Sequence, residues 1–130
     1  MSNWISGQCS GAKTADLGPL QLAWLGDAVW ELHQRLKHCR HPGRADDLHR
    51  AVVAEVRADA QAQLLQKLEP LLEPQEQELV RRGRNRAGRG PRRSDAAIYG
   101  QATGFETLLG WLFLNNPVRL KELLDHLDQF

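Results

Sequence analysis

The chain of 130 residues lacks any long apolar run, and stretches such as Trp111–Leu114 are far too short to span a bilayer. Its N-terminus, from Met1 to Leu20, also lacks the apolar segment that directs a protein to secretion. We therefore expect no membrane partner and a cytoplasmic location.

Cysteine is scarce, because Cys9 and Cys39 are the only two in the chain. This number excludes a disulfide framework, and both thiols are expected to be reduced. Cys39 lies near His38, His41 and His49 in the sequence. A zinc site is therefore an alternative, but the spacing fits no familiar tetrahedral zinc pattern.

Signs of β-structure are missing as well, since isoleucine and threonine are rare and no segment alternates apolar and polar residues. Leucine and alanine are plentiful at helical spacing. The sequence predicts an all-α fold with a single domain of six to seven helices over residues 17–130. A loose arm over residues 1–16 precedes it. The helices are expected from Pro19 to about Cys39, over 45–69 with a bend between 55 and 59, from Glu73 to Arg82, over about 95–115 with Ser94 or Asp95 as the cap, and over 118–127.

The first of these helices contains an unusual acid. Its apolar positions form one stripe that is expected to face the core: Leu22, Leu25, Val29, Leu32 and Leu36. Asp27 lies opposite that stripe, among alanines and tryptophans. Gly26 beside it costs a helix about 1 kcal/mol relative to alanine, but it lets another helix, an ion or a phosphate approach the backbone. The alternative is that Asp27 simply faces water.

A second acid, Glu106, lies at the edge of the apolar stripe of the helix over 95–115, one turn before Gly110. If the two helices pack together, Gly26 and Gly110 permit close approach, and Asp27 and Glu106 share a site. Two convergent carboxylates repel unless they share a proton or hold a cation. Oxygen ligands in small number favour Mg²⁺.

Positive charge is concentrated in one segment, the basic loop predicted over residues 81–94. It holds seven arginines and no acid before Asp95, while the rest of the chain has an excess of acids. Three glycines and a proline between Gly83 and Arg93 predict a flexible loop. Such a segment is typical of a local anion-binding site.

Three motifs in this order resemble the ribonuclease III family. Leu22–Leu32 is similar to its signature helix, and Phe105–Gly110 to its second acidic motif. Arg81–Asn85 and the following basic residues resemble the segment between them in one branch, Mini-ribonuclease III. The resemblance covers about residues 17–127.

The resemblance implies a Mg²⁺-dependent endoribonuclease that cleaves double-stranded RNA as a homodimer and leaves 5′-phosphate and 3′-hydroxyl ends. Asp27 and Glu106 would be the catalytic residues and the metal ligands. The substrate implied is a ribosomal RNA precursor, above all that of the large-subunit (23S) RNA. The RNA-binding residues would be Arg81, Arg82, Arg84, Asn85, Arg86, Arg89, Arg92 and Arg93.

The sequence departs from full-length ribonuclease III at three positions where that enzyme carries further acids, namely Leu20, Ala23 and Thr103. The family's separate double-stranded-RNA-binding domain is not expected either, since nothing follows Phe130. Two alternatives therefore stay open. One is a non-catalytic RNA-binding or ribosome-associated module on the same fold. The other is a helical interaction domain whose arginines bind an acidic partner.

Overall fold

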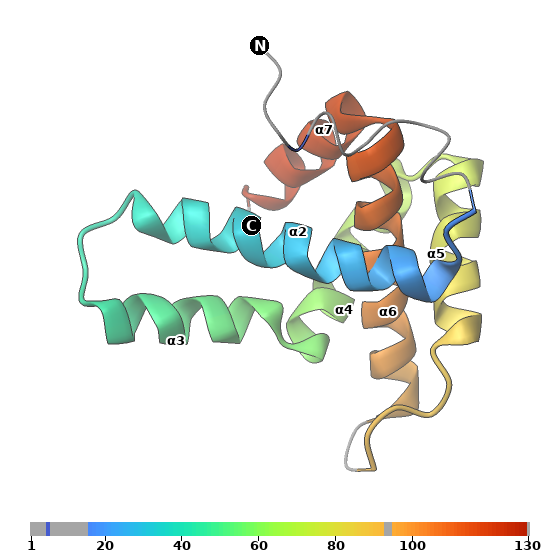
Figure 1. Cartoon of the computed structure of the whole chain (residues 1–130), viewed down its shortest axis with the longest axis horizontal. Helices are drawn as coiled ribbons and strands as arrows, with labels where there is room; N and C mark the ends of the chain where they lie inside the picture. Colours follow the sequence, from blue (N-terminus) through green and yellow to red (C-terminus); the bar gives the residue numbers. More distant parts are fainter. Residues whose placement is uncertain (1–4, 6–15, 93–94, 130) are drawn as a thin grey trace.

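The computed structural model describes Ile5, residues 16–92 and residues 95–129, apart from the side chain of Glu55. Within these ranges every regular element is helical, which confirms the all-α prediction. The predicted arm over residues 1–16 lies almost wholly outside them. The elements, labelled as in Figure 1, are α2 (Pro19–Cys39), α3 (Ala45–Val56), α4 (Ala58–Leu68), the 3₁₀ helix η2 (Glu69–Leu71), α5 (Pro74–Arg86), α6 (Ala96–Asn115) and α7 (Pro117–Leu127). None of the described helices is long and apolar enough to cross a membrane.

Helix α6 is the centre of the fold, and α2, α4, α5 and α7 all pack against it. Helix α2 crosses it at a steep angle, while α2 and α3 form a hairpin that projects away from the other helices (Figure 1). Trp30 and Phe105 meet edge to face, with ring centroids 5.2 Å apart, a favourable arrangement for aromatic rings. The most deeply buried apolar residues of α6 are Phe105, Leu108, Leu109 and Leu112.

Two details of the predicted helix boundaries are confirmed. The bend expected between 55 and 59 is a true break, because Arg57 has extended backbone angles between α3 and α4. Asp95 is the cap of α6, and its carboxylate accepts hydrogen bonds from the backbone N–H groups of Ala97 at 2.8 Å and Ile98 at 3.3 Å. Both bonds satisfy donors that a helix start leaves unpaired.

A partly buried ion pair connects α7 to α5. The Arg119 guanidinium donates to both oxygens of Glu76, at 2.8 and 2.9 Å, and also to the Leu71 carbonyl oxygen at 2.8 Å. Because the hydrogen bond from Arg119 favours the ionised form, the pKa of the Glu76 carboxyl is held below its usual value. This bidentate pair fixes the outer helix against the body of the protein.

The predicted core face of α2 is wrong only in its second half, because Leu22 is buried and Val29 packs against the core. Leu32 and Leu36, which were expected to point inward, are each 52% exposed. The residues that α2 buries are Leu22, Ala23, Gly26, Trp30 and Gln34. Helix α6 packs against the small residue Gly26 of α2. This contact brings the Ala23–Gly26 side inward and leaves Leu32 and Leu36 outside.

Candidate functional site

Helices α2 and α6 cross in direct backbone contact at two glycines. A Cβ atom on Gly26 would overlap the carbonyl oxygen of Glu106 and lie 2.9 Å from the backbone nitrogen of Gly110. A Cβ atom on Gly110 would in turn overlap the carbonyl oxygen of Leu22. The close approach that the sequence predicted is therefore present, and only glycine fits at either position.

This crossing brings Asp27 and Glu106 together, one from each helix. Asp27 is exposed, while Glu106 is partly buried. Burial, followed by the hydrogen bond and the negative charge of Asp27, raises the pKa of the Glu106 carboxyl to about 8. The two carboxyl groups therefore repel each other when both are ionised, and a shared proton or a bound cation removes this repulsion.

The two carboxylates suit a hard divalent cation that keeps most of its water. In the part of the chain that the structure describes, no three His, Cys, Asp or Glu side chains gather to hold a metal. The pair therefore offers at most two carboxylate ligands, one of them on the exposed side where water or a phosphate can approach. This donor set fits Mg²⁺, which binds through one or two carboxylates together with waters and substrate phosphates.

The three positions where full-length relatives carry further acids contain no ligand here. Leu20 is 47% exposed and Ala23 is buried against α6. The hydroxyl of Thr103 is used inside its own helix, where it donates to the Tyr99 carbonyl oxygen at 2.9 Å. Asp27 and Glu106 therefore form the acidic centre without help from these positions.

The predicted basic loop is partly wrong, because its first residues are helical. Helix α5 continues through Gly83 to Arg86, and Gly83 is buried against α6 instead of breaking the helix. The described residues of the RNA-binding prediction are nevertheless all exposed: the six arginines Arg81, Arg82, Arg84, Arg86, Arg89 and Arg92, and Asn85. Arg93 and Ser94 lie outside the described residues.

The arginines of α5 are held at a fixed place relative to the acidic centre. A Cβ atom on Gly83 would lie 2.8 Å from the Cβ of Thr107, the residue after Glu106. The Thr107 hydroxyl lies 2.8 Å from the Thr103 carbonyl oxygen and 3.1 Å from that of Pro19. Thr107 therefore joins α6, α5 and the start of α2 at one point.

A shallow hollow of about 200 Å³ opens where α5 meets the start of α2. Its lining is mostly basic and consists of Pro19, Arg81, Arg82, Asn85 and Arg86. Arg81 is already paired with Glu78, to which its Nε donates at 2.8 Å. The hollow can accept an anionic group such as a phosphate.

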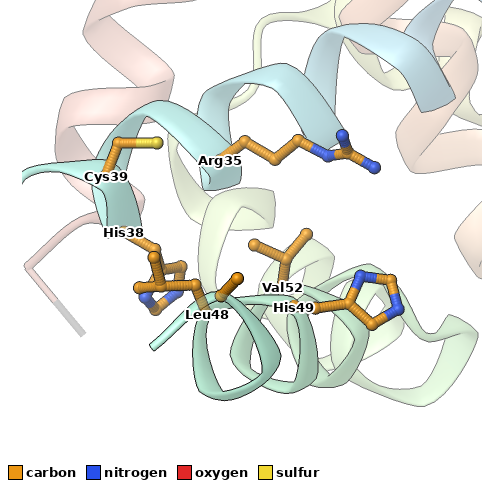
Figure 2. Close-up of a pocket in the computed structure, with 7 residues that line it drawn as sticks. Arg35, His38, Cys39, Leu48, His49 and Val52 are labelled. Atoms are coloured by element: carbon orange, nitrogen blue, oxygen red, sulfur yellow. The ribbon is translucent and has the colours of Figure 1, made fainter. Parts of the chain in front are cut away.

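A second hollow, of about 240 Å³, lies between the end of α2 and α3 and is lined by three of the four residues of the zinc alternative, without His41 (Figure 2). Cys39, His38 and His49 all line it, but the two imidazole rings lie at opposite ends. No group of three metal-binding side chains forms among the described residues. This hollow therefore supplies no ligand set for zinc.

Gln61 of α4 was missed by the sequence analysis. It is only 2% exposed, and its amide acts on the Glu106 carboxyl, opposing the rise in the pKa. The sequence did contain a signal, since Gln61 lies four residues before Leu65 and seven before Leu68, on the apolar face of its helix. A glutamine on that face calls for a polar partner.

Comparisons of the sequence with known proteins all lead to one family. The profile of the Ribonuclease III domain matches residues 20–117. A Mini-ribonuclease 3 of Synechococcus is 52% identical over 91% of this chain and 86% of its own length. A Mini-ribonuclease 3 of Symbiobacterium thermophilum is 46% identical, over 92% of this chain and 94% of its own. A crystal structure of a Fusobacterium nucleatum protein superposes with a TM-score of 0.77 and 27% identity, covering 87% of this chain and 90% of that one.

Proposed function

The chain belongs to the ribonuclease III family of endoribonucleases, and we propose that it cleaves double-stranded RNA with a Mg²⁺ ion held by Asp27 and Glu106. One observation carries this proposal. The two carboxylates meet at the glycine crossing of α2 and α6, beside a helix whose exposed face bears arginines.

In this account each side chain has one task. Asp27 and Glu106 would hold the cation. Burial and Asp27 keep a proton on the Glu106 carboxyl at neutral pH, and the positive charge of a bound cation would favour the ionised form of both carboxyls. When bound, Mg²⁺ supplies a Lewis acid for hydrolysis of the phosphodiester, which leaves 5′-phosphate and 3′-hydroxyl ends. The exposed arginines of α5 and the following loop bind backbone phosphates.

Recognition of the RNA is expected to depend on shape. An A-form duplex presents phosphates and 2′-hydroxyls across a wide, shallow minor groove, whereas its base faces are hidden. Arginines on the rigid helix α5 suit such a surface. From the resemblance to Mini-ribonuclease III, the first substrate to test is a precursor of the large-subunit (23S) ribosomal RNA in the cytoplasm.

A homodimer is part of the proposal, because one acidic centre can address only one strand of a duplex. Helix α2 leaves a row of apolar residues on its surface at a spacing of four residues, with Trp24 82% exposed. Large exposed side chains in such a row are typical of a protein interface. The row, which we call the α2 ridge, consists of Leu20, Trp24, Ala28, Leu32 and Leu36.

The dimer is tested by sedimentation at micromolar concentration, where the mass should be near twice 14.7 kDa. Trp24→Lys should give a monomer, since burying the lysine charge in a dimer interface costs free energy. Val118→Lys is the matched control, because Val118 is 72% exposed and belongs to α7, not to the α2 ridge. A wild-type monomer that cuts both strands together would contradict this part of the proposal.

The activity itself is tested with a structured ribosomal RNA precursor, in Mg²⁺ and then in excess chelator. Cleavage that stops with the chelator and returns with added Mg²⁺ supports the proposal. RNA binding without cleavage in either condition would favour the non-catalytic module.

A further inference from the structure

Gln61 is a polar side chain in an apolar setting. It lies on α4, where its neighbours Ala62 and Leu65 are buried in the core. Its own exposure is 2%, and its Nε2 has no hydrogen-bond partner in the described part of the chain. A buried donor without an acceptor costs free energy that an apolar side chain of the same shape would avoid. Packing alone therefore does not explain a glutamine at this position.

The group on which this amide acts is the Glu106 carboxyl of α6. Helix α4 packs on α6, and two side chains act on Glu106 with opposite effects. Asp27 favours the protonated form of Glu106, whereas Gln61 favours the ionised form. An amide N–H has this effect when it is directed at a carboxylate oxygen.

We infer that Gln61 is a positioning residue for the metal site: its Nε2 donates to one oxygen of the Glu106 carboxylate and leaves the other oxygen for the cation that Asp27 shares. The inference rests on the proposed function, since it takes Glu106 as a metal ligand. It gives the unpaired Nε2 of Gln61 an acceptor on the helix against which α4 packs. Hydrogen bonds of this kind orient ligating carboxylates and stabilise the bound metal.

The chain offers a matched control in Gln34. This glutamine of α2 is 1% exposed, and its Oε1 is also without a partner among the described residues. It lies seven residues after Asp27 and is not one of the groups that act on Glu106. Replacing either glutamine by methionine keeps the length of the side chain and removes its polar end.

The test measures binding of Mg²⁺ alone, by titration calorimetry without RNA, together with cleavage and thermal unfolding. Gln61→Met should weaken Mg²⁺ binding about tenfold and raise the half-saturating Mg²⁺ concentration for cleavage by the same factor. Its affinity for RNA in chelator should stay unchanged. Gln34→Met should leave Mg²⁺ binding unchanged, and Gln61→Asn, which keeps the donor, should lie between wild type and Gln61→Met.

The outcomes separate this inference from the proposed function. If Gln61→Met binds Mg²⁺ within twofold of wild type while Asp27→Asn does not bind it, the proposed function survives and the role of Gln61 is wrong. Equal losses in Gln61→Met and Gln34→Met would also overturn that role, since a general packing defect would explain them. If Asp27→Asn itself binds Mg²⁺ and cuts normally, the proposed function is wrong, and the role of Gln61 that rests on it is wrong as well.

Discussion

The Cα of Gly26 lies against the backbone of Glu106, so that a single methyl group on Gly26 would overlap the Glu106 carbonyl oxygen and lie 2.7 Å from its carbonyl carbon. Backbone cannot move aside as a flexible side chain can. The distance between the two acids is therefore set by the absence of a side chain beside one of them. The fold and the candidate site depend on the same contact.

Gly26→Ala should consequently destabilise the fold and disturb the candidate site. Alanine gains about 1 kcal/mol of helix propensity, but the overlap with α6 should outweigh this gain and leave a net loss of about 2–3 kcal/mol. Urea unfolding measures the loss. Gly43→Ala is the control, because a Cβ atom there would meet only the Leu48 side chain at 3.5 Å. Equal stability of the two variants would show that the crossing is looser than described.

The stability of the metal-free protein should depend on pH through Glu106. Burial and Asp27 raise the pKa of the Glu106 carboxyl from 4.5 to about 8, so between these values the folded state holds a proton that the unfolded state has released. The free energy of unfolding should therefore fall as the pH rises through this window and level off above it. The loss should be on the order of 2 kcal/mol, since solvent screening reduces the effect at a partly exposed group.

This dependence is measured by urea unfolding in chelator at about pH 5.5, inside this window, and at about pH 8.5, above it. Glu106→Gln cannot titrate, so the drop should be largely absent in that variant. Glu31→Gln is the control, because Glu31 pairs with Arg35 on the exposed surface of α2 at 3.1 Å. If the free energy of unfolding falls equally in wild type, Glu106→Gln and Glu31→Gln, groups other than Glu106 cause the pH dependence.

The arginines of α5 should affect RNA binding far more than folding. Arg82→Gln with Arg86→Gln removes two exposed charges beside the hollow at the start of α2. Thermal stability should be nearly unchanged, while the slope of log affinity against log salt should become shallower by roughly two units. Arg84 is left in place because its stem packs close to Gly100 of α6.

The matched control replaces Arg40 and Arg44 by glutamine. Both are exposed, Arg40 at the end of α2 and Arg44 directly before α3. This control makes the same change in net charge at a distant place. If both pairs flatten the salt dependence equally, the effect comes from the overall charge of the protein, and the exposed arginines of α5 are not the RNA contact.

The sequence predicted the helices well because their ends carry local signals. Pro19 starts α2, Asp95 caps α6, and the break near Arg57 separates two apolar stripes. Only part of the buried face of α2 could be predicted in this way, because Leu22 is buried as expected but Leu32 and Leu36 are exposed. Apolar periodicity counts side chains, whereas the decisive contact is made by Gly26, which has none.

The same reason explains the error over α5. Gly83 was interpreted as the start of a loop, because glycine is unfavourable in an isolated helix. In the fold Gly83 is buried against Thr107, and this packing against α6 outweighs the low helix propensity of glycine. Gln61 was overlooked because its partner lies on another helix, 45 residues later in the chain, and only the fold brings the two together.

The central claim is that Asp27 and Glu106 hold the metal that cleavage requires. Single-turnover cleavage of double-stranded RNA at saturating RNA, with increasing Mg²⁺, tests it most directly. Asp27→Asn and Glu106→Gln should each reduce the rate by on the order of 10²-fold or more, while RNA binding stays normal and Glu31→Gln cuts like wild type. Near-normal cleavage by either variant in Mg²⁺ would contradict the account.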